Sequence, residues 1–112
     1  MLVQFTVEHK DSYTRIGGTG RLNMVGAPQL RQAVSEVTAG GSSHVVLDMA
    51  GVEFMDSSGL GALIGCLKLA RQAGGDLRIA NIQPQVKMVL ELTSMNRVLT
   101  PYDSVEAAFP RA

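Results

Sequence analysis

Two adjacent serines, Ser57 and Ser58, stand between an aspartate and a glycine and are the side chains of this sequence best suited to chemistry. The apolar spacing that begins at Leu60 predicts a helix, so both hydroxyls fall where that helix starts. The first turn of a helix carries free N–H groups and a partial positive charge, which would tolerate a phosphate on a serine there. A serine in this place is also a common N-cap, and the two interpretations are compatible.

The helix predicted after the serines has two unlike sides. At about 100° per residue, its apolar side is formed by Leu60, Leu63, Ile64, Leu67 and Ala70, with Cys66, Leu69 and Ala73 extending it. The opposite side carries Gly61, Gly65 and Lys68. A glycine inside a helix is about 1 kcal/mol less favourable than alanine. We therefore expect Gly61 and Gly65 to mark a place where a partner, or the chain's own sheet, approaches closely. Gly59 and Gly61 also leave room for something to approach the start of the helix.

The elements that must position this helix alternate along the chain between strand and helix patterns. We expect strands at residues 3–7, 13–19, 44–48, 77–82 and 98–102, and helices at residues 28–39, 57–73, 84–95 and 104–109. The loop after the buried third strand is expected at residues 50–61, with the helix beginning inside it at Ser57 or Ser58. This order predicts an α/β fold, with a mixed, mostly parallel sheet and helices packed against it.

Composition bounds the class of protein. The chain has 112 residues, 46% of them hydrophobic, which suits one domain over residues 1–112. Ten basic residues balance ten acidic ones, which argues against a nucleic-acid surface. The single cysteine, Cys66, allows neither an internal disulfide nor a zinc cluster, so no metal or cofactor is expected. Without a signal segment or a long apolar run, we expect a cytoplasmic protein with no membrane contact.

Three enzyme-like or receiver-like hypotheses are weaker. Asp48 follows an apolar strand, as the acceptor of a phospho-aspartate receiver does, but the acid pair that would hold Mg²⁺ is missing. A hydrolase using Ser57 would need a base, and only His9 and His44 are available, without a Gly-x-Ser-x-Gly elbow. The glycines near residues 18–20 and 40–41 lack the full nucleotide-binding patterns, so we interpret both as loops.

The octapeptide Phe54-Met55-Asp56-Ser57-Ser58-Gly59-Leu60-Gly61 closely resembles the phosphorylation motif of the bacterial anti-sigma factor antagonists, members of the STAS-domain family. The resemblance extends over nearly the whole chain. Shorter matching segments are Gly20-Arg21-Leu22-Asn23, Val45-Val46-Leu47-Asp48, Gly74-Gly75 and Pro84-Gln85-Val86-Lys87. The long motif is specific, whereas each of the shorter segments alone would be weak.

The resemblance implies a partner-switching mechanism. Such antagonists bind an anti-sigma factor that is also a serine kinase, and this binding releases the sigma factor. The kinase phosphorylates the antagonist, which ends the binding, and a PP2C-type phosphatase resets it. The implied acceptor is Ser57, with Ser58 as second choice.

We expect a partner-binding surface that joins this motif and the loop at Asn23 to the polar side of the helix. Its expected residues are Asn23, Asp56, Ser57, Ser58, Gly59, Gly61, Gly65 and Lys68. Asn23 departs from the family, which usually has aspartate at this position. Alternatives within the family are a scaffold that binds other STAS domains and a partner-switching regulator of a non-sigma output. We expect a monomer or a weak dimer.

Overall fold

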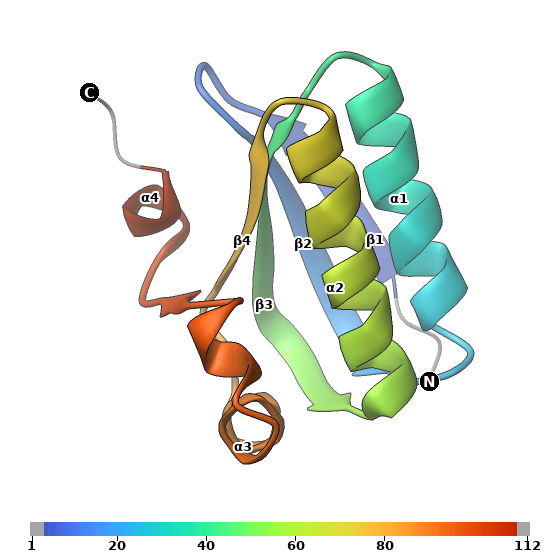
Figure 1. The fold of residues 1–112 in the computed structure, drawn as a ribbon, viewed down its shortest axis with the longest axis vertical. Helices are drawn as coiled ribbons and strands as arrows, with labels where there is room; N and C mark the ends of the chain where they lie inside the picture. The colour runs from blue at the N-terminus through green and yellow to red at the C-terminus, as the bar shows by residue number, and fades with distance from the viewer. Residues whose placement is uncertain (1–3, 110–112) are drawn as a thin grey trace.

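A β-hairpin opens the fold and parallel strands complete its sheet (Figure 1). The computed structural model describes residues 4–109. Strands β1 (Gln4–His9) and β2 (Thr14–Leu22) pair antiparallel. The parallel strands follow in chain order as β3 (His44–Met55), β4 (Asp76–Ala80) and β5 (Pro101–Tyr102). The predicted mixed, mostly parallel α/β architecture is confirmed.

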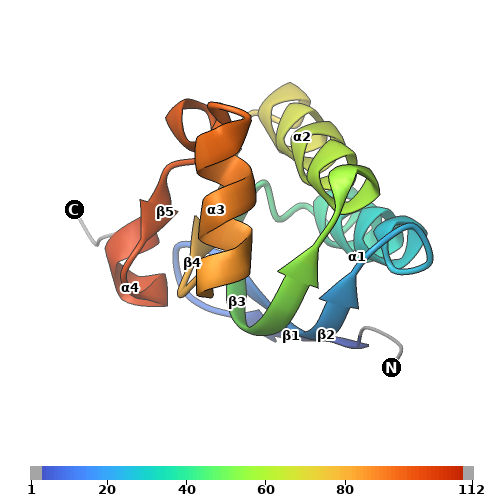
Figure 2. The ribbon, with the colours of Figure 1, turned by 90° about the horizontal axis from the view of Figure 1, so that it is seen from below.

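The helices lie on both faces of this sheet, but unequally. Helices α1 (Ala27–Ala39) and α2 (Ser57–Gln72) lie side by side on one face, and α3 (Pro84–Leu92) lies on the same side (Figures 1 and 2). The short helix α4 (Val105–Ala108) packs on the opposite face of the sheet, against β3 and β4. A single 3-10 turn, η1 (Met95–Arg97), connects α3 to β5.

The start of β3 is buried on both faces, as its continuous apolar run predicts. Val45 and Leu47 belong to the main core beneath α1 and α2, whereas Val46 belongs to a second cluster under α4. Successive side chains of a strand point to opposite faces, so this division follows directly from the sequence of the run.

Cys66 on α2 lies in the main core, and its burial raises the pKa of the thiol to about 11.

β3 is longer than predicted, and the expected loop at residues 50–61 was wrong. The strand continues to Met55 because its second half pairs with β2 alone, from Thr19↔Gly51 to Leu22↔Met55, after β4 has ended. That pairing is with a distant segment and leaves little local signal. The predicted last strand was too long, since only Pro101 and Tyr102 are extended there.

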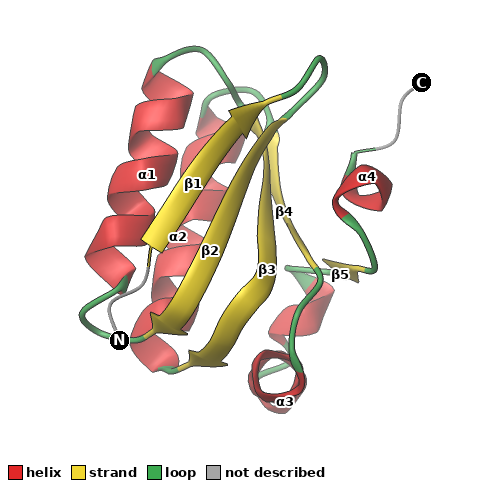
Figure 3. Cartoon of the chain, turned by 180° about the vertical axis from the view of Figure 1, so that it is seen from behind, coloured by secondary structure: helices red, strands yellow, loops and turns green. Residues whose placement is uncertain are grey.

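The face of the sheet opposite α1 and α2 is uncovered over β1 and β2 (Figure 3). There Arg15 lies between two carboxylates, with Nη1 2.8 Å from Glu8 Oε1 and Nη2 2.7 Å from Asp48 Oδ2. Partial burial raises the pKa of Asp48, but hydrogen bonds donated by Arg15, the Asn81 amide and the Ala50 N–H outweigh this and hold it below its usual value.

We expect Asp48→Asn to lower the free energy of unfolding by about 1–2 kcal/mol at pH 7, because it breaks a half-buried ion pair. The folded-state pKa of Asp48 lies below the unfolded value of about 3.9. The stability that ionised Asp48 contributes is therefore fully present above about pH 3.9. The contribution is lost as pH falls through the folded pKa. Urea unfolding of both proteins at pH 7 and pH 3 should show the difference shrink. A difference that stays constant between these pH values would contradict the assignment.

Candidate phosphorylation and partner-binding site

Strand β3 and helix α2 are joined by one residue, Asp56. Its backbone is extended, and its Oδ1 accepts a hydrogen bond of 2.9 Å from the N–H of Gly59. Asp56 is therefore the N-cap of α2, and the alternative in which a serine serves as the cap was wrong. Ser57 and Ser58 instead occupy the first two positions of the helix.

The Ser57 side chain is exposed, whereas Ser58 is half-buried. Within the part of the chain that the structure describes, neither hydroxyl has a hydrogen-bond partner. Because Asp56 already serves as the cap, the Ser57 hydroxyl has no structural task at the helix start. It is the more accessible of the two for a modifying enzyme.

The junction is held from both sides by contacts that are distant in sequence. Gln85, in the first turn of α3, accepts from the N–H of Met55 at 2.8 Å and donates to its carbonyl at 3.0 Å. On the other side, the N–H of Asp56 donates to the carbonyl of Leu22 at the end of β2. The helix start is thus positioned by rigid elements. Sequence reasoning missed the role of Gln85, because a contact over 30 residues has no local pattern.

Gly59 has a structural role that the prediction did not foresee. It is buried, and a Cβ added there would lie 2.2 Å from the carbonyl oxygen of Leu22 and 2.9 Å from its Cγ. The close approach inferred from this glycine is that of the chain's own strand β2. Placing Gly59 in direct contact with a partner was therefore wrong, since its surface is inside the molecule.

Gly61, Gly65 and Lys68 lie on the exposed side of α2. A Cβ on either glycine would meet no atom within 4 Å, so packing against the sheet does not explain them. A shallow groove between α1 and α2 runs beside Gly65 and is lined also by Arg31 and Ser35. With Ser57 at the end of the same side, these residues form a continuous surface along α2.

The β2–α1 loop adds two exposed apolar side chains that sequence reasoning did not single out. Met24 is 72% exposed and Val25 57%. They lie two and three residues after Leu22, whose carbonyl accepts the hydrogen bond from the N–H of Asp56, and so lie near that junction. Asn23 orders this loop, because its Oδ1 accepts hydrogen bonds of 3.1 Å from the N–H groups of Val25 and Gly26.

The model of the STAS domain matches residues 4–108 of the chain. The chain belongs to the STAS-domain family. It is 29% identical over 105 residues to the anti-sigma F factor antagonist of Paenibacillus polymyxa, covering 93% of this chain and 90% of the relative. Its fold matches an anti-sigma factor antagonist from Mycobacterium paratuberculosis with a TM-score of 0.83 and 26% identity, covering 95% of this chain and 90% of that one. The resemblance read from the octapeptide is confirmed.

A further likeness concerns the fold alone. The Bacillus protein SpoIIAA, solved in its phosphorylated form, matches with a TM-score of 0.70 at 22% identity, covering 93% of this chain and 96% of that one.

Asn23 in this STAS domain accepts its two hydrogen bonds through an uncharged oxygen, and the carboxylate of an aspartate could accept the same two bonds. The exchange therefore removes charge from the loop without removing the acceptor that orders it.

The two histidines lie at the opposite end of the sheet from Ser57. His9 lies at the end of β1 and His44 at the start of β3, whereas Ser57 follows the far end of β3. Both oxygens of Asp48 accept hydrogen bonds, and residues 4–109 contain no group of three His, Cys, Asp or Glu side chains placed to hold a metal ion.

Across residues 4–109, no helix has the length and apolar character to cross a membrane.

Proposed function

We propose that this STAS domain is an anti-sigma factor antagonist switched by phosphorylation of Ser57. In its unphosphorylated form it binds an anti-sigma factor that is also a serine kinase, and so frees a sigma factor. The observation that carries the proposal is the exposed Ser57 hydroxyl at the start of α2, where Asp56 rather than Ser57 caps the helix. The names of its relatives as anti-sigma factor antagonists support the same function.

Phosphate at Ser57 would change the surface without unfolding it. A phosphoserine carries a charge of about −1.5 to −2, which the N-terminus of a helix stabilises. The same charge and bulk would stand beside the Asp56 carboxylate, in the middle of the surface that a partner must cover. Docking would then require burial of an added negative charge, which is unfavourable without a cationic partner group.

We define the docking surface as the exposed residues on both sides of the junction: Met24, Val25, Ser57, Gly61, Gly65 and Lys68. The glycines allow a partner backbone to approach α2, and the two apolar side chains supply area that gains from being covered. Asn23, Asp56 and Ser58 support this surface from positions that are half-buried.

We expect Met24→Ser to weaken binding of the anti-sigma factor about tenfold, because full burial of a methionine side chain gains about 1.5–3 kcal/mol and tenfold corresponds to about 1.4 kcal/mol. The domain's own stability should change little, since Met24 is 72% exposed in the free protein. Isothermal titration calorimetry measures the binding and urea unfolding the stability. Leu92→Ser, at a side chain 78% exposed on α3, is the matched control and should bind like wild type. Unchanged affinity in Met24→Ser would remove the loop from the surface.

The acceptor is tested with the kinase partner, captured from the native cell as the protein that wild type retains and Ser57→Asp does not. We expect ATP carrying a labelled γ-phosphate to label wild type and Ser58→Ala, but not Ser57→Ala, because Ser57 is exposed and Ser58 is half-buried. Tryptic mass spectrometry locates the phosphate. Labelling that persists in Ser57→Ala and disappears in Ser58→Ala would show Ser58 to be the acceptor.

The remaining parts of the proposal follow from this switch. A PP2C-type phosphatase would remove the phosphate, and the cycle would run in the cytoplasm, where kinase and sigma factor meet. The domain would act as a monomer or weak dimer, with residues 1–112 forming one STAS unit. An experiment in which the captured partner is another STAS domain would instead favour the scaffold alternative.

A further inference from the structure

The helical layer formed by α1 and α2 carries an excess of positive charge. The whole chain has ten basic and ten acidic residues, so its formal net charge is zero. Helices α1 and α2 together contain Arg31, Lys68 and Arg71 but one acid, Glu36. Three cations against one anion give these two helices a formal charge of +2, which the rest of the chain balances.

Two of these cations line the groove between the helices, which has a volume of about 350 Å³. The groove is lined by Arg31 and Ser35 from α1, and by Gly65, Cys66, Lys68, Leu69 and Gln72 from α2. No acidic side chain lies among them. Burial raises the pKa of the Cys66 thiol, and the charge of Arg31 partly offsets this rise, which places the guanidinium close to the groove floor.

The chain supplies no counter-charge for these two cations. Arg31 and Lys68 are exposed, and neither forms an ion pair or a hydrogen bond with any residue between 4 and 109. Arg71 is different, because its Nε lies 3.3 Å from Oδ1 of Asp76.

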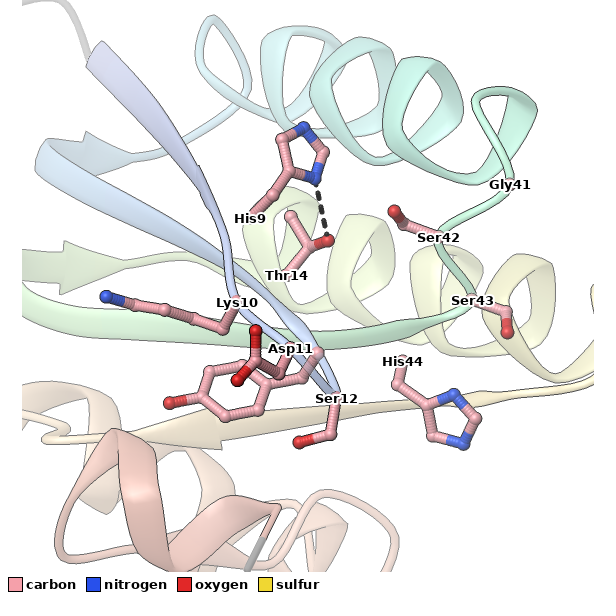
Figure 4. Close-up of a pocket in the computed structure, with 10 residues that line it drawn as sticks. His9, Lys10, Asp11, Ser12, Thr14, Gly41, Ser42, Ser43 and His44 are labelled. Carbon is pink, nitrogen blue, oxygen red and sulfur yellow. Dashed lines mark hydrogen bonds between the residues drawn. The ribbon is translucent and has the colours of Figure 1, made fainter. Parts of the chain in front are cut away.

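The pocket at the tip of the β1–β2 hairpin does not offer a comparable site (Figure 4). Its lysine, Lys10, is already paired, with Nζ 3.6 Å from Oε2 of Glu8. Figure 4 shows the Ser12 and Ser43 hydroxyls pointing away from His9. The α1–α2 groove is therefore the hollow in which unpaired cations are brought together.

The groove suits a protein segment better than other anionic partners. Leu69 is half-buried and offers apolar surface beside the two cations. A Cβ at Gly65 would meet no atom within 4 Å, so a partner backbone can approach the groove there. A nucleic acid or an anionic membrane would need a larger cluster of cations. The complementary occupant is a segment whose acidic residues flank an apolar one.

The groove lies within reach of a partner that covers Ser57. Lys68 lies about 16 Å further along α2 than Ser57, at about 1.5 Å per residue. An interface of ordinary size covers about 800 Å² on each partner, which is a disc of roughly 16 Å in radius. An interface centred on Ser57 therefore reaches the groove at its rim. Charges at a rim act mainly on the association rate and its dependence on salt.

We propose that the groove between α1 and α2 binds an acidic segment of the anti-sigma factor, with its carboxylates facing Arg31 and Lys68 and an apolar side chain packed on Leu69. This inference rests on the proposed function, because it assigns the groove to the same partner. The two cations attract the segment before docking and orient the partner over Ser57.

Zero-length cross-linking of the complex with the captured anti-sigma factor identifies the segment. A carbodiimide joins a lysine amine to a carboxylate in contact with it, so we expect a peptide pair that links Lys68 to an aspartate or glutamate of the partner. Lys68→Arg keeps the charge without the amine and should bind like wild type without this cross-link. Lys87, exposed on α3 and lining a separate cleft beside β5, should give none. A complex without the Lys68 cross-link, or a Lys68 cross-link between two copies of the domain, would overturn the inference.

The double variant Arg31→Glu/Lys68→Glu should associate with the anti-sigma factor about tenfold more slowly than wild type at low salt, with a nearly unchanged dissociation rate. The difference should shrink between about 0.1 M and about 1 M salt, as the screening length falls from about 10 Å to about 3 Å. Surface plasmon resonance measures both rates. Because both side chains are exposed and unpaired, the variant should fold, which urea unfolding checks. Lys87→Glu makes the same change of charge outside the groove and should associate like wild type.

The outcomes separate the groove from the switch at Ser57. An unchanged association rate in the double variant, an equal fall in Lys87→Glu, or a fall that persists at high salt would each contradict the groove. If Ser57→Asp still weakens binding in those cases, the proposed function stands without it. If the double variant associates slowly while Ser57→Asp binds like wild type, the groove is supported and the phosphorylation switch fails.

Discussion

Ser57→Asp binds the anti-sigma factor about a hundredfold more weakly than wild type, while its circular dichroism spectrum stays native. The carboxylate adds a negative charge next to Asp56, at the centre of the docking surface, where a complex would have to desolvate it. Penalties of about 2–5 kcal/mol are typical when an interface buries a charge without a partner, and 2.7 kcal/mol corresponds to a hundredfold. Calorimetric titration with the captured partner measures the change.

Ser12→Asp is the matched control, because it adds the same charge to an exposed serine at the hairpin tip, at the other end of β2 from the junction. It should bind the partner like wild type. Equal weakening in both variants would mean that net charge, rather than its position, decides the affinity. Wild-type affinity in Ser57→Asp would place the docking surface elsewhere on the domain.

Gly59→Ala lowers the free energy of unfolding by about 3 kcal/mol, the second large effect that the structure implies. The added methyl group would lie 2.2 Å from the Leu22 carbonyl oxygen and 3.0 Å from Cγ of Met55. Backbone atoms of β2 or α2 must therefore move, and overpacking of this kind typically costs about 1–3 kcal/mol or more. This outweighs the roughly 1 kcal/mol that alanine gains over glycine within a helix.

Gly61→Ala isolates the clash from the helix preference. Its methyl group would meet no atom within 4 Å, so we expect this variant to be up to about 1 kcal/mol more stable than wild type. Urea unfolding of the two variants should move the midpoint in opposite directions. If Gly59→Ala were as stable as Gly61→Ala, the close packing of α2 on β2 would be absent in solution.

The order of the elements could be predicted because each has a strong local pattern. Val45 to Leu47 form an unbroken apolar run, which is typical of a strand buried on both faces, and α2 repeats leucine and alanine at helical spacing. The motif around Ser57 could also be found from sequence, since its residues are adjacent. Its position at the start of α2 followed from the same spacing.

What could not be predicted depends on contacts between distant segments. The second half of β3 is a strand because it pairs with β2, and Gln85 supports Met55 from 30 residues away. The identity of the cap was open because aspartate and serine are both good caps, and only the backbone geometry separates them. Met24 and Val25 matter because the fold exposes them beside the junction, which no local spacing shows.

The most direct test compares one protein in two chemical states. Wild-type chain is phosphorylated by its captured kinase, Ser57 is confirmed as the modified residue by mass spectrometry, and its affinity for the same anti-sigma factor is measured with ATP removed. We expect phosphorylation to weaken binding at least a hundredfold, and phosphatase treatment to restore it. If the phosphorylated and dephosphorylated chains bind with equal affinity, Ser57 is not the switch of this domain.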